Sequence, residues 1–312
     1  MKRITILLIV LSLFTQALAA DDITTSNGLT LLISSLPEAK LIVSQSFTVP
    51  FLQGEGAMVK NNNVKFSIDA EITPISMGLL GGVIFTPIAF IEIAAGGLIG
   101  SGWNIELFGS EVRGIGANVS DNGKTSVDGS AFDGTFMGAH FGGAFQFDLA
   151  AVLPGDWNHV LFRSYHEANC RIYSRAGRGD SWFYESDHGE NQNGWNYYGN
   201  YLIGYQMPIF LNMVALLAET EKYLYNTPDG DLWGDSLGRW DFGLITNFKI
   251  TDKFSTALIT QFRLYRNYSN FTYNNKDKDD SNYNRYYRDR MLDDGRSLKF
   301  YRVAAILNYK LR

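Results

Sequence analysis

The chain contains many segments in which apolar and polar side chains alternate with a period of two residues. Residues 239–250 and 64–72 follow this pattern, and so does the C-terminal segment 297–311. In that last segment one face carries Tyr301, Val303, Ala305, Leu307, Tyr309 and Leu311, and the other carries Arg302, Asn308, Lys310 and Arg312. Successive side chains of a β-strand point to opposite faces, whereas a helix repeats apolar residues three and four positions apart. The pattern therefore predicts an all-β protein.

Two kinds of β-protein alternate in this way. A transmembrane barrel turns its apolar face outward to lipid, and its segments are about ten residues long. A soluble sandwich or lipocalin-like barrel turns the apolar face inward. The abundance of alternating segments and the aromatic residues near many segment ends favour the membrane barrel. A helical membrane protein is excluded by a mean hydropathy of only −0.10.

Short and long connections alternate along the C-terminal half. The short ones are Pro154–Trp157, Gln206–Pro208 and Thr251–Lys253, and the long ones are residues 109–134, 174–194, 226–238 and 267–295. Transmembrane barrels place short turns in the periplasm and long loops outside the cell. Counting back gives twelve strands, with ten to fourteen allowed: 28–35, 40–52, 63–74, 80–94, 98–108, 135–152, 158–173, 195–206, 209–225, 238–250, 253–266 and 297–311. The glycine-rich stretch from Met77 to Trp103 is thus interpreted as two strands joined after residue 94.

The N-terminus has the pattern of a secretory signal peptide. Lys2 and Arg3 precede an apolar run, and Ala17 and Ala19 form a small-x-small cleavage site. The run is shorter than the roughly 20 residues of a spanning helix. We expect residues 1–19 to be removed and residues 20–312 to form one barrel domain. Removing two of the 27 basic residues leaves 25 against 32 acidic residues, which argues against nucleic acid as a partner.

Together the Ala17–Ala19 signal, the Tyr301–Leu311 terminal strand and the turn/loop asymmetry resemble the bacterial outer-membrane β-barrel superfamily over the whole chain. No single family is indicated. The resemblance implies a single antiparallel transmembrane barrel of about twelve strands in the outer membrane, surrounded by its lipid. One departure is the C-terminus, Tyr309-Lys310-Leu311-Arg312, which lacks the terminal aromatic residue usual in the superfamily.

The alternation predicts a set of charged residues that face the barrel interior, the lumen. They are Lys65, Asp69, Glu71, Asp148, Arg163, Glu167, Arg171, Asp241, Lys249, Arg263, Arg302 and Lys310. One interpretation is a porin-like channel for small polar solutes whose lumen charges set selectivity. The other is a lumen closed by paired charges. Twelve strands lie between eight, which side chains fill, and sixteen, which leave a channel.

Other motifs give weaker signals. The surroundings of His140 and His166 do not match the His-x-Ser-Asn-Gly pattern of outer-membrane phospholipases, and Asp187-His188 lies in a long loop. The four histidines show no metal spacing, and no phosphate-binding loop follows a strand. Cys170, the one cysteine, fits a small apolar residue on a strand. We therefore expect no enzyme activity, no cofactor and no metal.

Two loop motifs concern surface ligands. Arg178-Gly179-Asp180 resembles the tripeptide that integrins recognise on animal cells. In loop 267–295, the carboxylates of Asp277–Asp280 could hold Ca²⁺, but a solvated or sugar-contacting loop fits the composition better. Three function classes follow: a passive channel, a surface-exposed adhesion protein that binds a host or surface ligand, and, third, an outer-membrane hydrolase.

Overall fold

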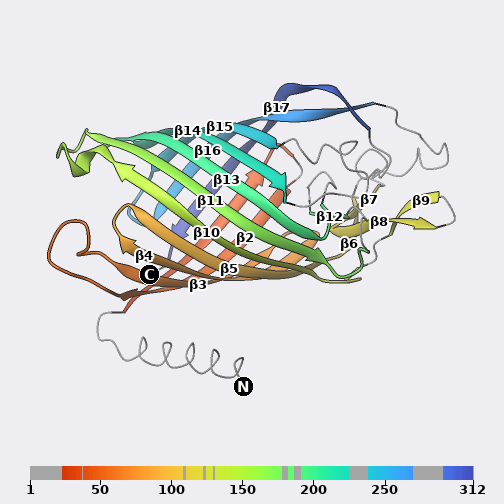
Figure 1. Ribbon diagram of the computed structural model, residues 1–312, viewed down its shortest axis with the longest axis horizontal. Helices are drawn as coiled ribbons and strands as arrows, with labels where there is room; N and C mark the ends of the chain where they lie inside the picture. Colours follow the sequence, from red (N-terminus) through yellow and green to blue (C-terminus); the bar gives the residue numbers. More distant parts are fainter. Residues whose placement is uncertain are drawn as a thin grey trace, which may run out of the picture.

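The computed structural model describes residues 23–36, 38–107, 110–121, 124–128, 131–177, 182–185, 191–224, 238–269 and 291–311. Within these residues, twelve antiparallel strands close into one barrel (Figure 1), which confirms the predicted fold class. The strands follow one another around the barrel as β1 (Thr24–Ser34), β2 (Glu38–Pro50), β3 (Asn63–Ile72), β4 (Ser76–Ile88), β5 (Ile91–Gly102), β10 (Phe136–Asp148), β11 (His159–Tyr173), β13 (Gly194–Gln206), β14 (Leu211–Tyr223), β15 (Arg239–Lys249), β16 (Phe254–Ser269) and β17 (Met291–Lys310), and β17 pairs with β1.

Six smaller elements lie in the connections. β6 (Asn104–Leu107) pairs with β7 (Ser110–Arg113), and β8 (Ile115–Asp121) pairs with both β9 (Lys124–Asp128) and β12 (Trp182–Tyr184). A short 3₁₀ helix, η1 (Leu149–Ala151), follows β10. No helix among the described residues is long and apolar enough to cross a membrane. The predicted signal peptide, residues 1–19, lies outside the described residues and stays a prediction.

The two faces of the barrel wall differ in polarity. Large apolar side chains such as Ile68, Phe141 and Leu216 are more than half exposed, and they share one face of their strands. The opposite face carries the buried polar groups, among them Glu71 and Arg263. A soluble barrel would bury its apolar face inside. The observed arrangement is the reverse, and it is the one that a lipid environment requires.

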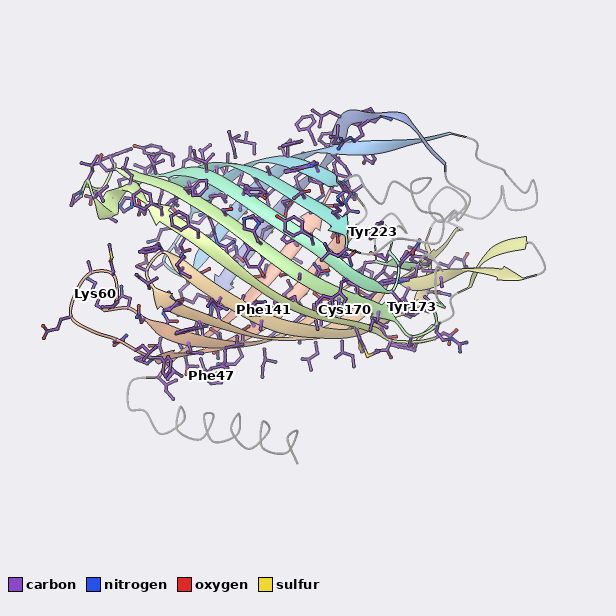
Figure 2. The ribbon with its side chains drawn as sticks, viewed as in Figure 1. Phe47, Lys60, Phe141, Cys170, Tyr173 and Tyr223 are labelled. Carbon is purple, nitrogen blue, oxygen red and sulfur yellow. The ribbon has the colours of Figure 1, made fainter. Side chains whose placement is uncertain are left out.

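The two ends of the barrel carry different connections. We name them the loop end, which holds connections 103–135 and 174–193, and the turn end, which holds turns 207–210 and 250–253. In the N-terminal quarter the lengths reverse. Strands β1–β2 and β3–β4 are joined by short turns at the loop end, while connection 51–62, which contains Lys60, lies at the turn end (Figure 2).

The join between β4 and β5 differs from the prediction. The turn lies at Ala89–Phe90, not after residue 94, so Gly96 and Gly97 are inside β5. A Cβ added to Gly96 would lie 2.6 Å from Cε1 of His140 and 2.7 Å from the carbonyl oxygen of Gly81. These glycines allow close approach across the wall, and they do not mark a turn.

Tyr301 is the second departure. It was predicted to share the outward face with Val303, but the register between β16 and β17 shifts between Gln261 and Phe262. Gln261 pairs with Arg302, whereas Phe262 pairs with Phe300, so Tyr301 is the extra residue of a bulge. Its ring lies 3.6 Å from the guanidinium carbon of buried Arg263. Tyr301 therefore belongs with the inward, charged side chains.

Candidate functional site

The candidate site is the inward face of the wall, where charged side chains form pairs along the barrel. Some pairs join adjacent strands: Lys40 to Glu71 at 3.2 Å, and Arg263 to Asp241 at 2.6 Å. Arg239 is paired with Glu221 in the same way. Each of these pairs matches residues that the strand register brings opposite or nearly opposite each other.

Other pairs pass over one intervening strand. Arg163 on β11 contacts Glu92 on β5 at 3.2 Å across β10, and Arg171 contacts Glu221 on β14 at 2.7 Å across β13. Arg302 on β17 contacts Glu38 on β2 at 2.7 Å across β1. Long side chains converge above an intervening strand on the concave side of a curved sheet. These contacts therefore place the charged face inside the barrel.

Two glutamates are held by neutral donors. Glu219 accepts hydrogen bonds from the Tyr198 hydroxyl at 2.5 Å and from Gln261 Nε2 at 3.0 Å. Glu167 accepts them from the Tyr165 hydroxyl at 2.5 Å and from Asn169 Nδ2 at 3.0 Å. Gln261 also accepts a hydrogen bond from Arg302 at 2.7 Å, which joins Glu219 to the Arg302–Glu38 pair.

Glycines let large inward side chains lie close to the wall. A Cβ on Gly142 would lie 2.8 Å from the Tyr165 hydroxyl, and one on Gly100 would lie 2.8 Å from the Tyr184 hydroxyl. The His140 ring covers Gly96 in the same way. Because these rings occupy space that a side chain would fill, they lie along the wall instead of extending toward the barrel axis.

A loop segment lies at the loop end, inside the wall (Figure 1). Trp182 of β12 packs against Phe136 and Tyr173, with ring centroids 5.3 and 5.9 Å apart, and Phe183 is fully buried. Figure 2 shows Tyr173 at this end of the barrel. Burial, together with the nearby Glu185 charge, raises the pKa of the Tyr184 hydroxyl. The segment is thus packed on β10 and β11.

The same segment is anchored on its other side by Glu185. Lys40 Nζ of β2 lies 2.8 Å from Glu185 Oε2, and Ser76 Oγ of β4 donates a hydrogen bond of 2.7 Å to Oε1. We call these contacts the Glu185 latch. Residues 182–185 therefore connect β10 and β11 with β4 and β2, along the half of the loop end that runs from β2 to β11.

The sequence-predicted lumen residues occupy two regions. Most lie on the inward face along the wall, where Glu71, Arg163, Arg171, Asp241, Arg263 and Arg302 form ion pairs. Lys65 and Asp69 share the inward face of β3. Three lie at the turn end: Asp148, which pairs with His159 at 2.7 Å and caps η1, Lys249, which pairs with Asp252 at 2.8 Å, and exposed Lys310.

Several inward charges were not predicted. They are Glu38, Lys40, Glu92, Glu219, Glu221, Arg239 and Lys299, together with Glu185 from the loop segment. Four of them, Lys40, Glu92, Glu219 and Glu221, lie in segments 40–52, 83–94 and 209–225, where apolar and polar residues alternate less regularly. The alternation of residues 239–250 places Arg239 on the polar face opposite Trp240, although Arg239 was not among the predicted lumen charges. Nothing in the sequence signals that Glu185 returns to the barrel wall.

The outward face carries one polar cluster, which sequence reasoning missed. Ser164 Oγ lies 3.0 Å from His166 Nε2, and His166 Nδ1 lies 2.8 Å from the Tyr197 hydroxyl. This is the spacing of a nucleophile, a base and an orienting group. However, β11 is paired on both sides, so its backbone N–H groups serve the sheet and offer no oxyanion site. The cluster satisfies its own polar groups at the lipid face.

Three of the other sequence motifs fall outside the part of the chain that the structure describes. Arg178, Gly179 and Asp180 lie outside the described residues, as do Asp187-His188 and most of loop 267–295. Cys170 lies on β11, half-buried, opposite Ala139 and Trp195 (Figure 2). Among the residues that the structure describes, no group of three His, Cys, Asp or Glu side chains is placed to hold a metal ion.

Comparisons with known proteins give only distant structural matches. No family model and no curated protein sequence matches the chain. A structure of the KdgM porin aligns with 92% of this chain and 99% of its own, at 9% identity and a TM-score of 0.39. The NanC porin aligns with 92% of this chain and 100% of its own, at 8% identity and a TM-score of 0.40. CdiB from Acinetobacter baumannii aligns with 92% of this chain and 60% of its own, at 9% identity and a TM-score of 0.37. The barrel assignment rests on the strand pairing described above.

Proposed function

We propose that this chain is a passive outer-membrane channel that carries small polar solutes through its lumen. The observation that supports the proposal is the direction of the ion pairs. Each ion pair between two described barrel strands joins adjacent strands or strands separated by one other, as in Arg263–Asp241 and Arg163–Glu92. A lumen closed by paired charges would instead need contacts between strands on opposite sides.

The size of the barrel supports the same reading. With twelve strands, a strand spacing of about 4.8 Å and a tilt of about 40°, the backbone diameter is roughly 24 Å. Charged side chains that pair along the wall, and rings such as Tyr165 that lie over glycines, extend little toward the axis. Arg163 and Arg171 keep about a third of their side-chain surface exposed to the lumen, at 37% and 32%. These features support the proposal of a polar path for water and small solutes along the axis.

The outward face supports a membrane location. Exposed apolar side chains, such as Phe141 and Leu216, would be costly in water but are suited to lipid. In the proposed orientation the turn end faces the periplasm and the loop end faces outside. Lumen residues predicted from the sequence then line the path, and Asp148, Lys249 and Lys310 lie at its periplasmic mouth.

Conductance of the purified, folded protein in a planar lipid bilayer tests the proposal. We expect discrete single-channel steps whose size increases with salt concentration, and swelling of protein-containing liposomes in small sugars. A matched variant is Gly142→Leu, in which a side chain would displace the Tyr165 ring toward the axis and reduce the step size. Folded protein that conducts nothing at any voltage would refute the channel.

One observation favours a second candidate, a surface-exposed protein that binds a ligand outside the cell. Ser34, the last residue of β1, pairs with Ala304, and β17 continues outward from there to Met291, still paired with β16. The β16–β17 hairpin thus projects beyond the neighbouring wall at the loop end (Figure 1). Binding of intact cells to host or surface ligands, lost on trimming this hairpin while conductance persists, would support this role.

A further inference from the structure

Basic and acidic side chains in the lumen differ in the kind of partner that they contact. Arg163, Arg263 and Arg302 each contact a carboxylate at 2.6–3.2 Å. Their charge is therefore locally compensated. Glu167 and Glu219 instead receive hydrogen bonds from tyrosine and amide side chains, which bring no charge. No ion pair involves either glutamate within the described part of the chain.

The shared pairs cancel one another. Glu221 contacts both Arg171 and Arg239, which leaves one positive charge in excess. Lys40 contacts both Glu71 and Glu185, which leaves one negative charge in excess.

Two single charges on β3 cancel as well. Lys65 and Asp69 both face inward on this strand, with opposite charges. Lys299 of β17 also faces inward, opposite Arg263 and over the Tyr265 ring, and it adds one positive charge. Among the described residues, the inward charges that remain away from the turn end are therefore Lys299 and the two carboxylates of Glu167 and Glu219, one positive charge against two negative ones.

We infer that the channel is selective for cations, and that Glu167 and Glu219 set this preference. The inference rests on the proposed channel function and adds the class of solute. Charges on a low-dielectric wall focus their field into the lumen, while an ion pair acts only as a dipole whose field falls off faster. Two uncompensated carboxylates attract cations and repel anions, and both lie beside Tyr198 of β13.

The position of the two glutamates strengthens their effect. Glu167 pairs with Tyr198 in the register, and the Tyr198 hydroxyl donates to Glu219, so one tyrosine lies between the two carboxylates. Glu167 is on β11 and Glu219 is on β14, and only β13 lies between these two strands. Both carboxylates would therefore attract a permeating cation, and both would repel a permeating anion.

The test is the reversal potential of single channels under a tenfold KCl gradient. We expect the current of the wild-type channel to reverse at a potential shifted toward the potassium equilibrium potential. The preference for potassium over chloride should be weaker at 1 M than at 0.1 M salt, because the screening length falls from about 10 Å at 0.1 M to about 3 Å at 1 M. Glu167→Gln and Glu219→Gln should each move the reversal potential toward zero, and the double variant should move it furthest. Glutamine keeps a carbonyl oxygen for the tyrosine donors, so the variants test charge with little change of shape.

Two controls separate lumen charge from other effects. Glu55→Gln removes one negative charge from an exposed residue of connection 51–62, outside the lumen, and should leave the reversal potential unchanged. The pair Arg163→Gln with Glu92→Gln removes two lumen charges with no net change, and should shift it little. Gel electrophoresis of unheated samples in detergent shows whether each variant is folded, because a folded barrel resists unfolding by the detergent and migrates differently from the heated, unfolded chain.

The outcomes distinguish the inference from the function on which it rests. A channel that conducts but prefers chloride, or in which Glu219→Gln shifts the potential no more than Glu55→Gln, overturns the selectivity and leaves the channel intact. A folded barrel that conducts nothing overturns both.

Discussion

Removing the Glu185 carboxylate tests whether residues 182–185 are held at the mouth of the barrel by the latch. The change removes a 2.8 Å ion pair with Lys40 and a 2.7 Å hydrogen bond from Ser76, while Lys40 keeps Glu71 at 3.2 Å. The side chains of Lys40 and Glu185 are 17% and 13% exposed, so solvent screens the pair only partly. Breaking a fully buried pair costs about 3–5 kcal/mol, and a charged hydrogen bond contributes about 1.5–3 kcal/mol.

Because Lys40 retains one partner, we expect Glu185→Ala to weaken the anchoring by about 2 kcal/mol. Glu185 also has a φ of 57°, in the left-handed region that costs a non-glycine residue about 1 kcal/mol. Glu185→Gly loses the same contacts but relieves this strain, so its loss should be about 1 kcal/mol. The difference between the two variants separates the backbone term from the ion pair.

Hydrogen exchange of the β12 amides is the appropriate measurement, because local opening, and not global unfolding, releases the segment. A loss of about 2 kcal/mol should speed exchange at Trp182–Tyr184 about thirtyfold, and the glycine variant about fivefold. Exchange of the β4 and β10 strands should not change. Wild-type exchange rates at β12 in Glu185→Ala would refute the latch, and would imply that Trp182 and Phe183 hold the segment alone.

Three further predictions follow from the two faces and the two ends of the wall. Leu244 faces lipid and its chain neighbour Ile245 faces the lumen, so Leu244→Arg should cost about 2–4 kcal/mol near the membrane midplane and Ile245→Arg clearly less, measured by urea unfolding in liposomes. The opposite order would reverse the assigned faces. Protease added to intact cells should cut within 174–194 and spare Thr251–Lys253, and the reverse would invert the topology. Gly142→Ala should destabilise the barrel by about 1–3 kcal/mol, because its Cβ would lie 2.5 Å from the backbone oxygen of His166, whereas a neutral result would contradict this close approach of β10 and β11.

Much of the barrel could be predicted because its signal is local. Alternation over ten residues identifies a strand wherever one face meets lipid, and the clean segments 64–72 and 239–250 match β3 and β15 closely. The join of β4 and β5 was misplaced because glycine has two uses. It permits turns, and it also permits the close approach of a ring such as His140 to a strand. Sequence alone does not distinguish them.

The bulge at Tyr301 shows a second limit. Alternation with a period of two predicts the face of each residue along a strand only as long as the strand has no bulge that shifts its register. One extra residue in β17 placed Tyr301 beside Arg263, although its spacing from Val303 is that of an outward residue. The contact with an arginine on the neighbouring strand is long-range, so no pattern within β17 reveals it.

Charge selectivity depends on a third kind of information, namely the partner that lies beside each charged side chain. The sequence has more acidic than basic residues, yet that excess says nothing about the lumen, because most of the inward charges are paired. Glu221 and Glu219 are two residues apart on one strand face, and they differ entirely in surroundings: Glu221 lies between two arginines, and Glu219 contacts a tyrosine, an asparagine and a glutamine. Strand β15, which brings Arg239 beside Glu221, brings Asp241 opposite Glu219. Asp241 is already paired with Arg263, so no arginine remains for Glu219. The register of β14, β15 and β16 thus decides which of the two carboxylates has a basic partner and which has only neutral ones.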